Sequence, residues 1–456
     1  MKTTTLVTLA IISSSNLFSQ TNPAILSWLQ NNSTYGSHYV SGNSTAIQDN
    51  VLANVQSVQY STDWVYATTK GIPTYPTGPF LDGNPSLATD QAAIFRFPLN
   101  PTENTGTKTP TNAGNIGVFI NGVALFDYRD GVAWNTSTSA LCGGPGNTPC
   151  PGGPGASMDW NRDAIPAEMA GFDCSKGHPA MGNYHHHQNP SAFKLDQVVL
   201  SNICNLYDAD GLYSINASEH SPLIGFAYDG FPIYGAYGYT NANGTGGVTR
   251  MKSGYELANY SVRTHYPDGT DVNDGPAVNA TYFLGYFRED YQWVAHAGQE
   301  DYLDIHNGRF CVTPEYPSGT YAYFCTVDAN WNSAYPYAVG PTFYGNVAAS
   351  KVTSISESVT SYTPTVNLSN LFESESNFSV FPNPSSEFIA VQVNGLLKNN
   401  IVLELFDSNG KLVRNAQINQ GSTIWYLDVR TLYNGQYTLK ISEGESFVSK
   451  KIIIGK

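Results

Sequence analysis

The chain has 456 residues, which is too long for one typical domain, and its formal net charge is −14. Charged residues make up only 13% of it and aromatic residues another 13%, so the composition favours strands and structured loops over helices. The acidic balance argues against nucleic acid as a partner, because phosphate recognition needs a basic surface.

The first twenty residues have the pattern of a secretion signal. Met1 and Lys2 give a short positive start, residues 6–12 form an apolar run, and Ser19 and Gln20 close the segment. The run is shorter than the ~20 apolar residues that span a bilayer, and no later stretch predicts a transmembrane segment. We therefore expect residues 1–20 to be a signal peptide and the remaining chain to work outside the cytoplasm.

Residues 21–350 predict an irregular β-rich body whose core covers residues 60–345. Short apolar runs alternate there with turn signals. Asn121-Gly122, between the apolar runs 116–120 and 123–126, predicts a hairpin. Residues 163–169 could form a short helix.

The last hundred residues change character twice. Residues 351–376 are rich in Ser and Thr and predict a linker. Residues 377–456 alternate polar and apolar side chains between regular turns, which predicts a small C-terminal β-sandwich. The expected fold is therefore mainly β, with short helices in the body.

The chain contains six cysteines, and an even number in an exported protein favours disulfides. The spacing suggests sequential pairs, although other connectivities stay open. The expected pairs are Cys142–Cys150, Cys174–Cys204 and Cys311–Cys325.

Four of the nine histidines fall within residues 178–187. On a strand, His185 and His187 would project to one face, about 6.5–7 Å apart at their Cα atoms. His178, just before a turn at Pro179, could fold back and supply a third nitrogen. Three imidazoles with an open position suit zinc or copper, and neutral histidine also suits iron or nickel. The alternative is a solvated strand or an aromatic stack, and His186, on the other face, should be packed or exposed.

Three carboxylates and one more histidine are further candidates. Asp229 lies among aromatic residues and is either a turn former or an oxygen ligand for a metal. Asp304 and His306 would share one strand face and could form a ligand pair, although an ion pair between Asp304 and Arg309 is an equal alternative. Glu315 and Asp304 are the candidates for acid/base catalysis.

Two oxygen-rich loops, at residues 208–211 and 268–275, leave calcium open as a bound ion. Both lack the full twelve-residue calcium pattern, so surface turns are the simpler interpretation.

The tail resembles the type A C-terminal sorting domain of the type IX secretion system. The resemblance rests on Pro382-Asn383-Pro384, the turn at 406–411, the segment 434–437 and the basic-apolar end. It implies passage through an outer membrane, with the secretion machinery as a partner, and release or attachment at the surface. The alternative is an accessory module that binds a surface glycan.

The body resembles the YHYH domain family. The family motif Tyr-His-Tyr-His appears as Tyr184-His185-His186-His187, in which His186 replaces the second tyrosine. The segments 225–235 and 307–321 also match the family pattern.

The resemblance implies which residues converge. It points to a centre formed by His185, His187, Asp229 and Glu315, with His178 adjacent, and to binding of a metal ion. His306 departs from the pattern, because many relatives carry Cys at this position.

Three functions follow as hypotheses. The first is an exported metal-binding protein, with nitrogens from His178, His185 and His187 and an oxygen from Asp229 or Asp304. The second is an extracellular enzyme that acts on a polysaccharide or another polymer. The third is a surface binding or adhesion protein without chemistry.

Overall fold

The computed structural model describes residues 22–456 except 44, 81–85, 145, 154–157, 191–216, 365–377, 394–399, 419–423 and 444–445. The expected signal peptide at 1–20 therefore lies outside the described residues. So do Cys204, the loop at 208–211 and residues 365–376 of the expected linker.

The chain divides into two compact units, residues 1–363 and residues 364–456. Each is built mainly of β-strands, as the sequence predicts. Helices are few and short among the described residues: α1 (Pro23–Leu26), α2 (Ala164–Glu168) and the 3₁₀ turns η3 (Met169–Gly171) and η4 (Arg288–Asp290).

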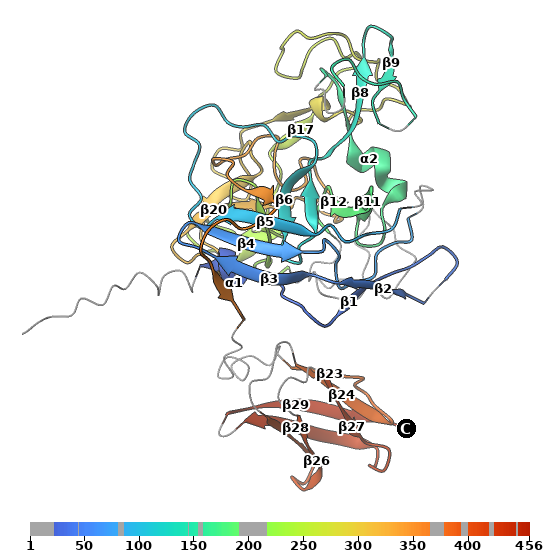
Figure 1. Ribbon diagram of the computed structural model, residues 1–456, viewed down its shortest axis with the longest axis vertical. Helices are drawn as coiled ribbons and strands as arrows, with labels where there is room; N and C mark the ends of the chain where they lie inside the picture. The colour runs from blue at the N-terminus through green and yellow to red at the C-terminus, as the bar shows by residue number, and fades with distance from the viewer. Residues whose placement is uncertain are drawn as a thin grey trace, which may run out of the picture. The chain divides into compact units, whose positions relative to one another are not determined.

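One sheet of the first unit has five antiparallel strands (Figure 1). Their order is β21 (Ser350–Val352), β5 (Ala93–Pro98), β4 (Trp64–Thr69), β3 (Val55–Tyr60) and β22 (Thr360–Tyr362). Lys351 pairs with Phe95, and Ser361 pairs with Gln59. The expected start of the linker at residue 351 is therefore wrong, because the chain runs along both edges of this sheet before it leaves the unit.

The second sheet has eight strands and carries the histidine segment. Its order is β11 (Gly177–Ala180), β12 (Asn183–His186), β7 (Ala124–Phe126), β6 (Asn115–Phe119), β13 (Leu223–Ala227), β14 (Pro232–Tyr234), β20 (Thr320–Phe324) and β19 (Gly308–Cys311). The pairs β12–β7 and β14–β20 are parallel, and the others are antiparallel. The predicted hairpin at Asn121-Gly122 joins β6 to β7, and the expected helix at 163–169 is α2.

The central strands of this sheet are buried on both faces. In β20, Tyr321 and Tyr323 belong to one hydrophobic cluster, while Ala322 and Phe324 belong to another. The second cluster also contains Phe95 and other residues of β4 and β5, so it fills the space between the two sheets. This explains why every residue of β13 and β20 is buried, instead of every second one.

Smaller sheets complete the first unit. The three-stranded sheet contains β10 (Asn161–Asp163), β8 (Arg129–Asn135) and β9 (Ala140–Cys142). Three two-stranded sheets pair β1 (Tyr35–His38) with β2 (Ile47–Leu52), β15 (Tyr237–Tyr239) with β16 (Val248–Arg250), and β17 (Tyr255–Leu257) with β18 (Tyr291–Trp293).

The cysteines follow the expected pairing only in part. Cys142 and Cys150 form a disulfide, and Cys174 is disulfide-bonded as well. Cys311 and Cys325 are free and buried, so the third expected pair is wrong. The sheet register gives the reason: Cys311 pairs with Thr320, and Cys325 lies five residues further along, roughly 16 Å at the rise of a strand. A disulfide needs Cα atoms within about 7 Å of each other.

The second unit has a core of its own. One sheet contains β23 (Phe378–Phe381), β24 (Phe388–Val393) and β27 (Ile424–Asp428). The other contains β26 (Leu412–Ile418), β25 (Ile401–Phe406), β28 (Gly435–Glu443) and β29 (Ser446–Ile454). Buried side chains from both sheets, such as Ile389 and Leu403, belong to one hydrophobic cluster.

Candidate metal centre

A tight hairpin brings the first two histidines together. β11 and β12 are antiparallel, and His178 is the direct partner of His185. The connecting residues Met181 and Gly182 have φ angles of 49° and 83°, as a two-residue hairpin turn requires. The turn was expected at Pro179, which instead lies inside β11.

His187, directly after β12, completes a cluster of three imidazoles. The Nε2 atoms of His185 and His187 are 3.1 Å apart. One ligand atom from each of His178, His185 and His187 lies within 4.8 Å of the others. The three residues are 7%, 1% and 4% exposed, so the cluster is buried. Figure 1 shows the hairpin below α2.

Backbone carbonyls determine which ring nitrogen carries the proton. The Nδ1–H of His185 donates to the carbonyl of Asn183 at 2.8 Å, and the Nδ1–H of His187 donates to the carbonyl of Asp127 at 2.6 Å. Each carbonyl can only accept, so each Nδ1 is protonated and each neutral ring keeps its lone pair on Nε2. Two lone pairs therefore face each other, an arrangement that a cation between them would relieve.

Burial keeps these rings uncharged at neutral pH. It lowers the pKa of His178 to about 3 and that of His187 to about 4. Burial, followed by the charges of the neighbouring histidines, holds the pKa of His185 well below its ordinary value. Neutral imidazole is the form that binds metals, so the cluster is in its ligand form without losing protons.

Aromatic rings enclose the cluster. Phe126 stacks on His185 with ring centroids 3.9 Å apart, and the edge of Phe172 meets His178 at 4.9 Å. Phe172 also contacts His187. These contacts restrict rotation of the imidazoles and keep water away from them.

A carboxylate that the sequence did not single out approaches the same cluster. Oε2 of Glu168 lies 3.4 Å from Nε2 of His178 and 3.4 Å from Nε2 of His187. Glu168 is the last residue of α2, which Asp163 caps at its N-terminus and in which Pro166 occupies the first turn. The sequence predicts this helix, but no spacing rule connects its last residue to histidines ten or more positions away.

His186 points to the other face and has a different role. Its Nε2 lies 2.9 Å from the hydroxyl of Tyr75, and its Nδ1 lies 3.1 Å from the carbonyl of Lys176. It is fully buried, so of the two outcomes expected for it, packed or exposed, the structure shows the packed one.

Asp229 lies apart from the three grouped histidines. Its Oδ2 accepts hydrogen bonds from the hydroxyl of Tyr323 at 2.6 Å and from the backbone N–H of Gly345 at 2.8 Å. Its Oδ1 accepts from the N–H of Phe231, across the turn between β13 and β14. Burial raises its pKa to about 6. Asp229 thus holds a turn, the alternative to metal binding that the sequence left open.

The third candidate segment is organised differently from the expectation. Asp304 and His306 do not share a strand, because Asp304 accepts from the N–H of His306 in a turn before β19. The hydroxyl of Tyr321 donates to Asp304, and Nδ1 of His306 lies 2.6 Å from Oγ1 of Thr342. The alternative, an ion pair between Asp304 and Arg309, does not form among the described residues either.

Two further side chains of this segment bond elsewhere. Arg309 donates to the carbonyls of Tyr239, Thr240 and Glu300 instead of to Asp304. The Oε2 of Glu315 accepts from the hydroxyl of Tyr234 at 2.8 Å. The predicted centre is therefore dispersed, and only its histidines are grouped.

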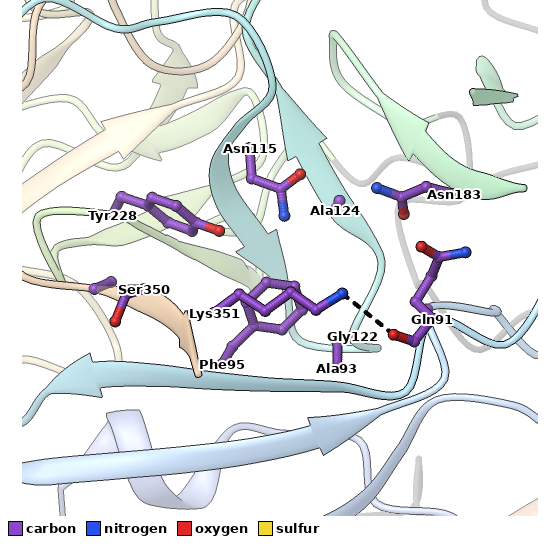
Figure 2. Close-up of a pocket in the computed structure, with 12 residues that line it drawn as sticks. Gln91, Ala93, Phe95, Asn115, Gly122, Ala124, Asn183, Tyr228, Ser350 and Lys351 are labelled. Atoms are coloured by element: carbon purple, nitrogen blue, oxygen red, sulfur yellow. Dashed lines mark hydrogen bonds between the residues drawn. The ribbon is translucent and has the colours of Figure 1, made fainter. Parts of the chain in front are cut away.

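A cavity of about 460 Å³ adjoins the histidine hairpin (Figure 2). The side chains of Asn115, Asn183 and Tyr228 surround it, and the ammonium of Lys351 donates across it to the carbonyl of Gln91. Asn183 links the two features, because its carbonyl accepts from the His185 ring.

A comparison with known protein families shows which family the β-rich body belongs to. The family model described as YHYH protein matches residues 94–336, which is more than half of the chain. The chain belongs to the YHYH protein family. The match includes the motif at 184–187 and both further segments that carried the resemblance. No curated protein matches this YHYH protein.

The tail matches a second family model, described as secretion system C-terminal sorting domain, over residues 379–455. This confirms the resemblance to sorting domains of the type IX system. The YHYH protein is therefore exported, to the medium or the cell surface, and its tail interacts with the secretion machinery. Within the described residues, no helix is both long and apolar enough to cross a membrane.

Proposed function

We propose that this exported YHYH protein binds one transition-metal ion through His178, His185 and His187, with Glu168 as a fourth, oxygen ligand. The proposal rests on the Nε2 atoms of His185 and His187, which lie 3.1 Å apart with their lone pairs facing each other. Nitrogens bound to one ion at ~2.0–2.1 Å are about 2.9–3.4 Å apart, depending on the coordination angle. The distances from Glu168 to the histidine nitrogens, both 3.4 Å, fit the same range.

The ligand set favours zinc or copper. Imidazole nitrogens suit both ions, and copper(II) generally binds such sites more tightly. The three imidazoles are neutral and the carboxylate carries one negative charge. The ligands therefore offset part of the charge of a divalent ion. The low exposure of the rings supports tight retention of the ion.

Metal analysis of the full chain tests the proposal. The protein is stripped with a chelator, loaded with zinc or copper, dialysed, and measured by elemental analysis. We expect one ion per chain, and loss of that ion in the double variant His185→Ala/His187→Ala. The exposed His265 provides a matched control, because His265→Ala should keep the ion.

Thermal unfolding separates loss of metal from loss of fold. In chelator, wild type and the double variant should both unfold cooperatively. Added metal should raise the Tm of wild type and leave that of the variant unchanged. A wild-type protein that carries no metal after loading would overturn the proposal and favour the metal-free alternatives.

A further inference from the structure

A second cavity, of about 380 Å³, is lined by residues of β17, β18 and η4 and contains none of the clustered histidines. Its volume falls in the range of small-molecule sites, ~300–1,000 Å³. Its walls contain the half-buried rings of Tyr255, Tyr266 and Tyr291. The exposed ring of Trp293 also lines it.

Strand register places three of these rings on one face. Tyr255 pairs with Trp293, and Leu257 pairs with Tyr291. Direct partners on antiparallel strands, and residues two apart on one strand, project to the same side. Tyr255, Tyr291 and Trp293 therefore form one aromatic platform, and Tyr335 stacks on Tyr291 with ring centroids 4.2 Å apart.

Hydrogen bonds at their polar tips hold the rings in place. The hydroxyl of Tyr255 donates to the carbonyl of Ile305 at 2.7 Å, and Nε1 of Trp293 donates to that of Leu303 at 3.2 Å. The hydroxyl of Tyr266 donates to the carbonyl of Asp159 at 2.9 Å. With these polar atoms engaged, the rings that line the cavity are held in place and lose little freedom when a ligand binds.

Among the described residues that line this cavity, two charged side chains keep some of their hydrogen-bonding atoms unused. Arg288 donates from Nε to Glu289, but its terminal nitrogens make no hydrogen bond within the described chain. Gln292 also lines the cavity, but its side chain projects to the face of the strand opposite the platform, so the polar side chains of the cavity are those of Arg288, Glu289 and Asp268. Asp268, at the rim, offers a carboxylate of which one oxygen accepts from Thr270. The cavity thus combines donors with acceptors around aromatic faces.

Charge narrows the class of ligand. Glu289 offsets Arg288, Asp268 adds a negative charge, and the whole chain carries −14. An acidic ligand is therefore disfavoured. A pyranose ring presents C–H groups on its faces, which pack on aromatic rings, and hydroxyls at its rim, each able to donate and accept. We propose that this cavity binds a sugar ring of a neutral glycan.

Affinity electrophoresis of the full chain tests this site in the presence of a chelator, so that the outcome is independent of the metal centre. The probes are a soluble β-1,3-glucan, a xylan and a galactomannan as neutral glycans, and alginate as an acidic one. At least one neutral glycan should retard the wild type. Trp293→Ala should weaken that binding roughly tenfold or more, because it removes a stacking face.

A control variant makes the result specific. Phe283 has an exposure similar to that of Trp293, 42% against 37%, and lies outside the cavity lining, so Phe283→Ala should bind like wild type. The proposal fails if no neutral glycan retards the wild type, if Trp293→Ala binds unchanged, or if alginate binds more strongly than every neutral glycan.

Discussion

In the histidine cluster, single hydrogen bonds to backbone carbonyls determine which ring nitrogens keep a free lone pair. The carbonyls of Asn183 and Asp127 each hold one Nδ1–H, and this directs the remaining lone pairs of His185 and His187 at each other. His186, between them in sequence, meets the hydroxyl of Tyr75 instead and has no lone pair left for a metal. Adjacent histidines thus differ in role because their partners differ.

Glu168→Gln tests the oxygen ligand at this scale. The amide keeps the size of the side chain but loses the negative charge that would face the ion. We expect metal affinity to fall by about 10–100-fold, the loss typical when a carboxylate that supports a metal site is removed. Isothermal titration with zinc measures it. Glu256→Gln is the matched control, because Glu256 lies 3.7 Å from His296 in a separate glutamate–histidine pair and should leave the affinity unchanged.

The sequence predicts the nitrogens of the candidate site but not its oxygen. Clustering singles out His178, His185 and His187, and the local hairpin brings them together. Asp229 and His306 were plausible ligands because of their residue types, yet hydrogen bonds to Tyr323 and Thr342 engage them elsewhere. Which polar group meets which partner depends on contacts far apart in sequence, and a spacing pattern does not contain them.

At the level of elements, the short helix α2 positions Glu168, and Asp163 anchors that helix. Oδ1 of Asp163 accepts from the N–H of Ile165, and Oδ2 accepts from the hydroxyl of Tyr337 at 2.6 Å. Burial raises the pKa of Asp163 from 3.8 to about 8. The folded protein therefore holds a proton at neutral pH that the unfolded chain releases.

This shift predicts a pH dependence of stability. Between pH 3.8 and about pH 8 the folded state binds more protons than the unfolded state, so the Asp163 contribution to the free energy of unfolding falls as pH rises. Asp163→Asn keeps the helix cap but cannot ionise. Urea unfolding at pH 5, 7 and 9 measures this. The free energy of unfolding of the variant should increase relative to that of wild type as pH rises. Parallel profiles for the two proteins would contradict the shift, and Asp268→Asn, at an exposed turn, serves as the control.

Elements with strong local signals could be predicted, and those defined by pairing could not. The Asn121-Gly122 hairpin and the helix at 163–169 follow from turn and capping chemistry. The strands β21 and β22 have only three residues each and no apolar alternation, so their composition resembles a linker. They form strands because Lys351 and Ser361 pair with the strands β5 and β3 of the five-stranded sheet.

At the scale of the whole molecule, the sorting domain and the candidate metal site belong to separate units. The sorting domain at 379–455 lies in the second unit, and every grouped histidine lies in the first. A chain that ends at Thr363 should therefore fold, bind metal with wild-type affinity, and fail to leave a bacterium that has type IX secretion. Cell fractionation with metal analysis of the retained protein measures both parts. Export of the shortened chain, or loss of its metal site, would contradict this division.

The position of β11 gives the proposed ion a mechanical consequence. Among the described strands, β11 is the edge of the eight-stranded sheet and its partner is β12. An ion held by His178, His185, His187 and Glu168 would fasten that edge strand to its neighbour, to the segment beyond it and to α2. Since it would bind only the folded hairpin, it would add about 2.7 kcal/mol of stability at a free concentration of 100 times Kd. The resistance of this sheet edge to local unfolding would then rise with the logarithm of the free metal concentration in the surrounding medium.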